Sequence, residues 1–441
     1  MEGSREIPKL FGIALHWQIA IALLLAALVG GIVQMAAPDG VEASATALGS
    51  GLVATLDFIG GLFVNALKMI VVPIILASII VGVANMAGQD AFGRVGGKTL
   101  GFYVITGIFA IFTGLIAVNL ISPGTVEGAQ AMRNALPDAT AQLARAEGRG
   151  FGDLVGIISR AIPPNIIEAA AETQLLALIF VGAVFGYFMS RLTGKARDTL
   201  QSFWEGVQEV TIMITMWIMR FAPLGVFALV GETFIVSGFA PLVALGFFFI
   251  TVLLALAIHF FGWLPLLLRF VGRVNPLAYY RKLLPAQLTA FSTASSSATL
   301  PVTLNSAADA GVPRRVTGFV LPLGATVNMD GTALYECVVV IFIAQVMGID
   351  LTIGQQLLVL LLALLTSIGV AGIPAASLVA IVLILPVVGL PVEAIGLVLA
   401  VDRILDMCRT AVNVTGDLTV TALVARAEGE ELPEVAAAQA A

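Results

Sequence analysis

Long apolar runs separated by short polar connections make up most of the first 270 residues of the chain. A helix needs about 20 apolar residues to cross a hydrocarbon layer about 30 Å thick. Between the third and fourth runs, residues 123–160 are rich in Ala, Gly, Arg and Glu, which predicts an extramembrane segment. The pattern therefore predicts six membrane-spanning helices, at residues 11–35, 51–86, 99–121, 175–189, 207–236 and 241–270.

Two apolar segments in the second half are interrupted by small and polar residues. Residues 276–309 are broken by the Ser-rich stretch 291–301, and residues 354–388 are broken by 367–377. Non-helical backbone at membrane depth is tolerated only where it is buried in protein or lines water. We therefore predict two re-entrant helical hairpins, each followed by a full-length helix, at about 316–346 and 393–425. Paired broken segments of this kind point to a transporter's binding site at the membrane midplane.

The composition agrees with a membrane protein. Hydrophobic residues make up 59% of the chain and charged residues 11%, against about 25% charged in typical globular domains. A net charge of −6 with scattered Lys and Arg argues against nucleic-acid binding. Cys337 and Cys408 both lie in apolar segments, and His16 and His259 are far apart, so neither a disulfide nor a His/Cys metal site is expected.

The basic residues predict the orientation, because they concentrate on the cytoplasmic side of a membrane. They occupy every second connection, which places the N-terminus and residue 270 in the cytoplasm, and the C-terminus is expected there as well. The apolar run at 11–35 lacks a small-residue cleavage site, so we expect a spanning helix there and no signal peptide. The residues that set this orientation are Arg5, Lys9, Arg94, Lys98, Arg191, Lys195, Arg197, Arg269, Arg273, Arg281 and Lys282.

The last predicted helix carries a polar stripe. Asp402, Asp406, Arg409, Asn413 and Asp417 fall within an arc of roughly 80° at 100° per residue. Exposing the five charges of this helix, Arg403 included, to hydrocarbon would cost roughly 12–18 kcal/mol. The stripe must therefore face protein, ions or water. One interpretation is a ligand site, and the alternative is that Asp/Arg pairs only join helices.

A second polar cluster lies at residues 324–332, in the preceding spanning helix. Its Gly, Asn, Asp and Thr residues are poor in helix interiors. Local unwinding would expose carbonyl oxygens beside Asn328 and Asp330, and hard cations select oxygen ligands. The carboxylates of Asp330 and Asp417 would offset the charge of a monovalent cation. The alternative is a simple kink stabilised by Ser/Thr hydrogen bonds to the backbone.

The stripe also suggests a substrate. A guanidinium such as that of Arg409 matches a carboxylate with two donors, and Asp406 suits an ammonium group. Together they predict an amino acid with an acidic side chain. An intramembrane hydrolase using Ser295–Ser297 lacks a nearby base, so no enzyme is expected. A channel is disfavoured because a charged, narrow site suits binding more than permeation.

Several motifs in order resemble one family, the dicarboxylate/amino acid:cation symporters, which include archaeal aspartate transporters and animal excitatory amino acid transporters. The motifs are residues 294–301, 328–332, 371–374 and 402–410, followed by Asn413 and Asp417. The resemblance implies an all-α polytopic membrane protein with eight transmembrane helices, two re-entrant hairpins and inverted repeats. It also implies a homotrimer and an elevator motion.

The resemblance divides the chain into a fixed scaffold and a moving transport domain. Scaffold helices 1 and 2 lie in 1–98, transport-domain helix 3 in 99–122, and the loop with scaffold helices 4 and 5 in 123–236. Residues 237–441 form the rest of the transport domain, with a cytoplasmic tail. The resemblance places the substrate on Ser296, Thr332, the Gly372/Ile373 backbone, Asp406, Arg409, Thr410 and Asn413.

Three sodium sites are implied in the same way. The first uses Gly324, Asn328, Asn413 and Asp417; the second uses Thr326, Met329, Ser367, Ile368 and Val370; the third uses Tyr103, Thr106, Asn328 and Asp330.

The sequence departs from the family pattern at Gly107, where many relatives have a hydroxyl, which weakens the third sodium site. Relatives also carry an additional arginine at the position of Ala294 or Met407, and both are uncharged here, so we expect gating and substrate release to differ. Glu336 matches the proton-carrying glutamate of the animal transporters, and its alternative role is a hydrogen-bonded structural acid.

The function predicted is therefore a secondary-active symporter of aspartate or glutamate, coupled to sodium and with Glu336 as a candidate proton carrier. The alternative is a proton-coupled symporter of C4-dicarboxylates such as malate, succinate or fumarate. No organic cofactor is expected. The expected location is a prokaryotic plasma (inner) membrane, where the protein contacts the lipid bilayer.

Overall fold

The structure is a computed structural model and describes residues 15–38, 41–87, 94–134, 162–172, 175–369 and 376–432. Helices form its secondary structure, and the described residues contain no β-strand, which confirms the predicted all-α class. The helices before residue 240 are α1 (Leu15–Ala36), α2 (Ala47–Met69), α3 (Val71–Ala87), α4 (Val95–Ile121), α5 (Ala129–Asn134), α8 (Ile166–Ala171), α9 (Leu175–Ser190), α10 (Lys195–Met219) and α11 (Ala222–Ser237).

The second half is helical as well. A π-helical turn, η4 (His259–Trp263), joins α12 to α13, and a short 3₁₀ turn, η5 (Val392–Ile395), precedes the last helix. The helices are α12 (Pro241–Ile258), α13 (Leu264–Phe270), α14 (Pro276–Thr293), α15 (Ser296–Asp309), α16 (Arg314–Val327), α17 (Asp330–Met347), α18 (Ile353–Gly369), α19 (Ala376–Val387) and α20 (Gly396–Ala427).

Five helical stretches among the described residues are long and apolar enough to cross a membrane. A sixth candidate is the pair α10 and α11, which is bent by 52° at its break. The run expected at 175–189 forms α9, which is shorter than these spans. The five stretches are Trp17–Ala36, Ala47–Ala84, Val95–Thr125, Pro241–Phe270 and Arg314–Met347. The protein is thus an integral membrane protein.

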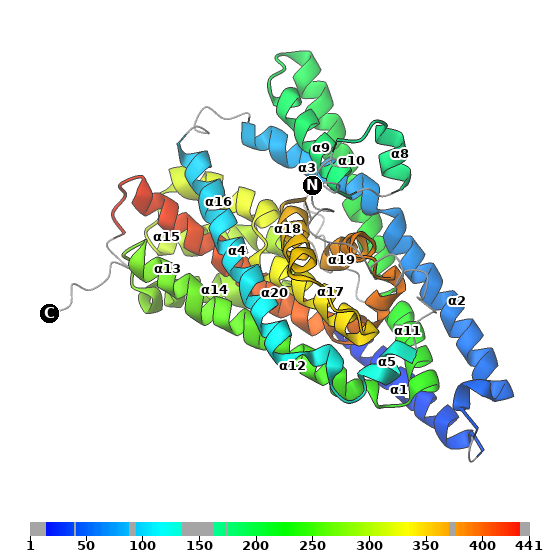
Figure 1. The fold of residues 1–441 in the computed structure, drawn as a ribbon. Coiled ribbons are helices and arrows are strands. Elements are labelled where there is room, and N and C mark those ends of the chain that lie inside the picture. Colours follow the sequence, from blue (N-terminus) through cyan, green and yellow to red (C-terminus); the bar gives the residue numbers. More distant parts are fainter. Residues whose placement is uncertain are drawn as a thin grey trace.

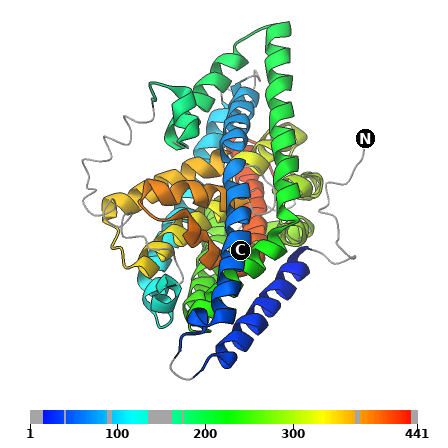
Figure 2. The same cartoon turned by 90° about the vertical axis from the view of Figure 1, so that its right-hand side faces the viewer.

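Two groups of helices pack mainly among themselves. In the first group α11 packs against α1 and α2, and α3 packs against α9 and α10. In the second group α4 packs against α12, α17, α18 and α20, and α20 also packs against α14, α16 and α17. Figure 1 shows α13 to α16 on one side of the molecule and α1, α2 and α11 on the other, with α17 and α20 between them. In Figure 2 the blue helices α1 and α2 face the viewer.

Both predicted hairpins are present as pairs of packed helices. α14 packs against α15, and the chain reverses at Ala294, whose φ of 50° is left-handed, and at Ser295. The side chain of Ser295 caps α15 by accepting a hydrogen bond from the backbone N–H of Ala298. The turn is narrower than the stretch 291–301 suggested, because Pro301 lies inside α15. α18 packs against α19, and residues 370–375 between them lie outside the described residues.

The span preceding the second hairpin is broken where unwinding was predicted. α16 ends at Val327 and α17 begins at Asp330, with Asn328 (φ −110°, ψ 89°) and Met329 (φ −116°, ψ 65°) between them in non-helical conformations. The backbone groups at this break lack their usual partners within a helix. The break therefore leaves donors and acceptors for a site in the middle of the bundle.

Candidate functional site

The centre of the candidate site is a fully buried arginine on α20. Arg409 donates from Nη1 to Asp402 Oδ1 at 3.0 Å and from Nη2 to Asp406 Oδ1 at 2.9 Å. All three residues belong to the stripe predicted from the sequence. Their spacing of three and seven residues places them on neighbouring turns of one helix face.

Residues from two other elements also contact the guanidinium of Arg409. Ser377, in the first turn of α19, accepts a hydrogen bond from Nη2 at 2.8 Å. The ring of Tyr335 on α17 lies under the guanidinium, with 3.8 Å from Cζ to the ring centroid, a cation–π contact. Nε of Arg409 is buried and has no hydrogen-bond partner among the described residues. The arginine is therefore held from three helices and keeps an unused donor.

A second arginine, Arg403, contacts the same aspartate. Its Nη1 lies 3.2 Å from Asp406 Oδ2, on the opposite oxygen from Arg409. The two arginines and the two aspartates of this cluster carry formal charges that cancel. A buried ion cluster of this kind is strongly destabilised when one member is removed.

Asn413 joins α20 to the first turn of α17. Its Oδ1 accepts from the backbone N–H of Gly331 at 2.8 Å and of Thr332 at 3.3 Å, and its Nδ2 donates to Thr332 Oγ1 at 3.0 Å. These contacts satisfy donors at the beginning of α17 that the helix itself cannot. Gly331 is required at this close approach, since an added Cβ would lie 2.8 Å from the backbone oxygen of Arg409.

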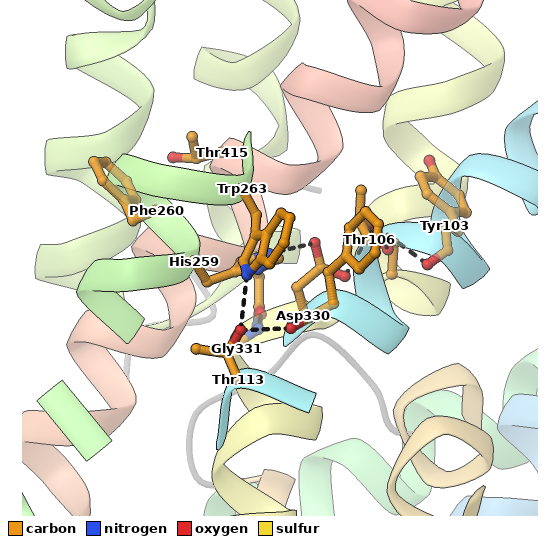
Figure 3. Close-up of polar contacts among 12 residues, drawn as sticks. Tyr103, Thr106, Thr113, His259, Phe260, Trp263, Asp330, Gly331 and Thr415 are labelled. Atoms are coloured by element: carbon orange, nitrogen blue, oxygen red, sulfur yellow. Dashed lines mark hydrogen bonds and ion pairs between the residues drawn. The ribbon is translucent and has the colours of Figure 1, made fainter. Parts of the chain in front are cut away.

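Oxygen atoms gather beside the break between α16 and α17. Asn328 Nδ2 donates to Asp417 Oδ1 at 3.0 Å, and Thr106 Oγ1 lies 3.1 Å from Asp330 Oδ1 and 3.4 Å from Asn328 Oδ1. Thr106 Oγ1 is also 3.2 Å from the backbone oxygen of Tyr103. The four residues expected at the third sodium site are thus adjacent, and Figure 3 shows Tyr103, Thr106 and Asp330 together.

Gly324 makes room for this cluster. An added Cβ there would lie 2.5 Å from Asp417 Oδ1 and 2.7 Å from the hydroxyl oxygen of Tyr103, closer than real contacts allow. Gly416 on α20 also makes room for the cluster, since an added Cβ there would lie 2.6 Å from Asp330 Oδ2. Of the residues expected at the first sodium site, Asn328, Asp417 and Gly324 lie together, whereas Asn413 turns its oxygen to the N-terminus of α17.

His259 reaches the same oxygen cluster from the π-helical turn η4. Its Nε2 lies 3.3 Å from Asp330 Oδ2, and its ring is fully buried. Nearby, Trp263 Nε1 donates to Thr113 Oγ1 at 3.0 Å (Figure 3). The extra residue in a π turn redirects side chains, and such turns are frequent at functional sites. Asp330 is thus held by Thr106 on one oxygen and by His259 on the other.

Glu336 lies two turns into α17 and is fully buried. Its Oε2 is 2.6 Å from Thr366 Oγ1 on α18, and its Oε1 has no hydrogen-bond partner among the described residues. Thr366 Oγ1 is also 2.8 Å from the backbone oxygen of Leu362. The carboxyl group of Glu336 is therefore linked to the first arm of the second hairpin.

The remaining predicted residues are dispersed or only partly described. Ser296 is buried in the first turn of α15, and Thr410 Oγ1 donates to the backbone oxygen of Asp406 at 2.8 Å. Thr326 and Met329 lie near the α16–α17 break, and Ser367 and Ile368 lie in the last turn of α18, which packs against α16. Val370, Gly372 and Ile373 lie outside the described residues.

The structure shows the environment of each position at which the sequence departs from the family pattern. A Cβ at Gly107 would lie 3.8 Å from Asp330 Oδ1 and 3.0 Å from Leu364 Cδ1, so a larger residue there would approach the oxygen cluster. Ala294 occupies the left-handed turn of the first hairpin, and Met407 is half-buried on α20. The second guanidinium beside Asp406 comes instead from Arg403.

Several contact residues were not among the predicted site residues. Tyr335, Ser377, His259 and Thr366 lie in mainly apolar segments, and their partners are distant in sequence. Helical periodicity could have identified Arg403 from the sequence, because it lies about 60° from Asp406 around the helix, at the edge of the stripe. The arrangement as a whole presents donors for an anion beside oxygens for a cation.

Comparison with known proteins identifies similar chains. The model of the sodium:dicarboxylate symporter family matches residues 15–427. The proton/sodium-glutamate symport protein of Geobacillus stearothermophilus is 35% identical over 419 residues, which cover 95% of each chain. The proton/glutamate-aspartate symporter of Escherichia coli (strain K12) is 34% identical, covering 94% of this chain and 93% of the relative. The excitatory amino acid transporter 3 of Mus musculus is also 34% identical, covering 86% and 80%.

Proposed function

Because the chain belongs to the sodium:dicarboxylate symporter family, we propose that it is a secondary-active symporter of acidic amino acids, aspartate or glutamate, driven by sodium. Relatives covering almost the whole chain are glutamate or glutamate-aspartate symporters by name. These relatives are transporters, and the proposed activity is transport without catalysis.

The observation that carries the proposal is the pairing of Arg409 with Asp406 at the centre of the bundle. An acidic amino acid brings a side-chain carboxylate, which suits the two-donor guanidinium of Arg409, and an ammonium group, which suits Asp406. Thr410 on α20 bonds to the backbone oxygen of Asp406, and Asn413, one turn after Arg409, bonds to Thr332 on α17. Ser296 of the first hairpin and the Gly372/Ile373 backbone of the second complete the proposed substrate site.

Sodium is the proposed co-transported ion and binds as cargo. Sodium prefers oxygen ligands, and the cluster of Asn328, Asp330, Asp417 and Thr106 supplies carboxylate, amide and hydroxyl oxygens beside an unwound backbone. The two carboxylates favour a cation there, since two buried negative charges without counter-ions are costly. Gly324, Thr326, Met329, Ser367, Ile368, Val370, Tyr103 and Asn413 are the other proposed ligands.

A proton is proposed to travel on Glu336. Thr366 has a single hydroxyl proton but two acceptors within 2.8 Å, Glu336 Oε2 and the Leu362 carbonyl. When Glu336 is protonated, it donates to Thr366 and Thr366 donates to Leu362, so that both hydrogen bonds form. This geometry suits a neutral carboxyl group and supports a role in proton coupling.

The proposed mechanism is an elevator motion within a homotrimer. The packing of α1, α2 and α11, and of α3 with α9 and α10, supports a scaffold formed by residues 1–98 and 123–236. The helices α4 and α12 and those from α14 through α20 pack against one another, which supports a transport domain formed by residues 99–122 and 237–441. We further propose cytoplasmic termini and a location in a prokaryotic plasma membrane.

The test is uptake by purified protein in liposomes. An inward sodium gradient should drive accumulation of radiolabelled aspartate or glutamate, and dissipating the gradient should stop it. Uptake that persists without sodium and follows a proton gradient, with succinate or malate as the better substrate, would replace this proposal with a proton-coupled C4-dicarboxylate symporter.

A further inference from the structure

Asp406 is held by two guanidinium groups, one on each carboxylate oxygen. Arg409 Nη2 lies 2.9 Å from Oδ1, and Arg403 Nη1 lies 3.2 Å from Oδ2. Both arginines are three residues away along α20, one on either side of the aspartate. The charge of Asp406 is therefore already compensated before a ligand arrives.

The Arg403 contact is not an ordinary surface ion pair. Its side chain is only 11% exposed, and that of Asp406 is 8% exposed. Nε of Arg403 is buried and finds no hydrogen-bond partner among the described residues. Ion pairs exposed to water on a helix surface stabilise it only weakly, whereas a desolvated pair interacts far more strongly. Arg403 thus adds an effective positive charge to the site.

We propose that Arg403 is a specificity-determining residue that competes with the ammonium group of a ligand for Asp406. This inference rests on the proposed function, in which Asp406 receives that ammonium group. An amino acid displaces Arg403 from Asp406 Oδ2. A dicarboxylate of the same length without an ammonium group leaves Arg403 in place. Because Arg403 then still compensates the charge of Asp406, Asp406 does not repel the dicarboxylate. Arg403 therefore lets one site accept both classes of ligand.

The consequence is a difference between two matched ligands. Aspartate and succinate share a four-carbon dicarboxylate skeleton, and succinate lacks the ammonium group. Without Arg403, succinate would face an Asp406 compensated only in part, and a like charge this close is strongly unfavourable. Aspartate would lose a nearby positive charge but also a competitor for Asp406, and these two effects oppose each other.

The experiment is equilibrium binding in saturating sodium, with radiolabelled aspartate displaced by unlabelled succinate. The variants are Arg403→Met and Arg403→Gln, which remove the charge, and Arg403→Lys, which keeps it. Arg426→Met is the matched control, since Arg426 lies near the other end of α20 and bonds to the backbone oxygens of Gly272 and Glu430. Sodium-dependent thermal stabilisation identifies the variants that are folded, and either neutral variant is sufficient.

In the neutral variants we expect succinate affinity to fall at least about tenfold, while aspartate affinity changes by less than about threefold. Arg403→Lys and Arg426→Met should keep the wild-type ratio. Equal changes for both ligands, an unchanged ratio, or a wild-type protein that does not bind succinate would each overturn the role of Arg403. A wild-type protein that binds succinate in sodium but not aspartate would instead refute the proposed function.

Discussion

α1 and the pair α16–α17 are both long enough to cross a membrane, but they differ in hydropathy and in burial. In the most apolar 18 residues of α1 the mean hydropathy is 2.4, and 28% of these residues are buried. In the most apolar 18 residues of Arg314–Met347 the mean hydropathy is only 1.5, and all 18 of these residues are buried. The more polar segment is thus the one that protein surrounds, as expected if lipid excludes charges and protein partners can pair them.

The difference shows where the sequence of this protein is constrained by chemistry. α1 exposes Leu24, Leu28 and Ile32, whose apolar side chains need no specific partner. α17 holds Asp330, Thr332 and Glu336, and each of these contacts a named group on another helix. Substitutions in the buried region should therefore change binding or coupling, and substitutions at the exposed positions of α1 should not.

The largest effect is expected at Arg409. In Arg409→Met, Asp402 and Asp406 lose their shared partner, and truncating one member of a buried ion pair costs about 3–5 kcal/mol. Aspartate affinity, measured by sodium-dependent binding, should fall by a factor of about 100 or more.

The control for Arg409→Met is Leu24→Ala on α1, whose side chain is 71% exposed. This variant should bind aspartate as the wild type does. If Arg409→Met retained wild-type affinity, the buried cluster would serve only to join helices, and the contrast between the two regions would be one of packing alone.

The next effect is expected at Gly324 on α16. In Gly324→Ala the added methyl group would lie 2.5 Å from Asp417 Oδ1 and 2.7 Å from the Tyr103 hydroxyl, so the oxygen cluster must shift. We expect sodium affinity to fall about tenfold, because ligand geometry sets the affinity of an oxygen site. Sodium titrations of thermal stability measure this change.

Gly318→Ala is a closely matched control, since Gly318 lies in the same helix and a Cβ there meets nothing within 4 Å. It should bind sodium like the wild type. A similar loss in both variants would mean that α16 responds to the loss of glycine itself and that the oxygen cluster is not the sodium site.

The sequence predicted the all-helical class, both interrupted hairpins and the break at Asn328, because these features depend on local apolar pattern and helix propensity. It also placed Asp402, Asp406 and Arg409 on one face, since helical periodicity relates residues of the same helix. Contacts between helices have no such rule. His259 on Asp330 and Ser377 on Arg409 depend on packing angles and on a π turn, which no periodicity encodes.

A smaller effect, on coupling, is expected at Glu336. In Glu336→Gln the side chain keeps its shape and its contact with Thr366 but cannot carry a proton. Transport should continue and lose its dependence on pH across the physiological range. The measurement is sodium-driven aspartate uptake over a pH series.

The control for Glu336 is Glu232→Gln, which removes a carboxyl group from α11 in the proposed scaffold. It should keep the wild-type pH dependence. Persistent pH dependence in Glu336→Gln would show that another group carries the proton.

The smallest effect is expected at the C-terminal end of α20. Glu428 bonds to Lys98 Nζ at 2.7 Å and to Arg94 Nη2 at 2.6 Å, and Lys98 also donates to the carbonyl of Ala427. The hydrogen bond from Lys98, followed by that from Arg94, lowers the pKa of Glu428 below its ordinary value. A lowered pKa in the folded state means that the contact stabilises the protein above the ordinary pKa and is lost as the pH falls through the lowered one.

In Glu428→Gln we therefore expect a slightly lower unfolding temperature at neutral pH, converging with the wild type in acid and in high salt. Glu431→Gln, at an exposed position three residues further along the chain, should match the wild type throughout. An offset that stayed constant with pH would show that shape, and not charge, links α4 to the end of α20.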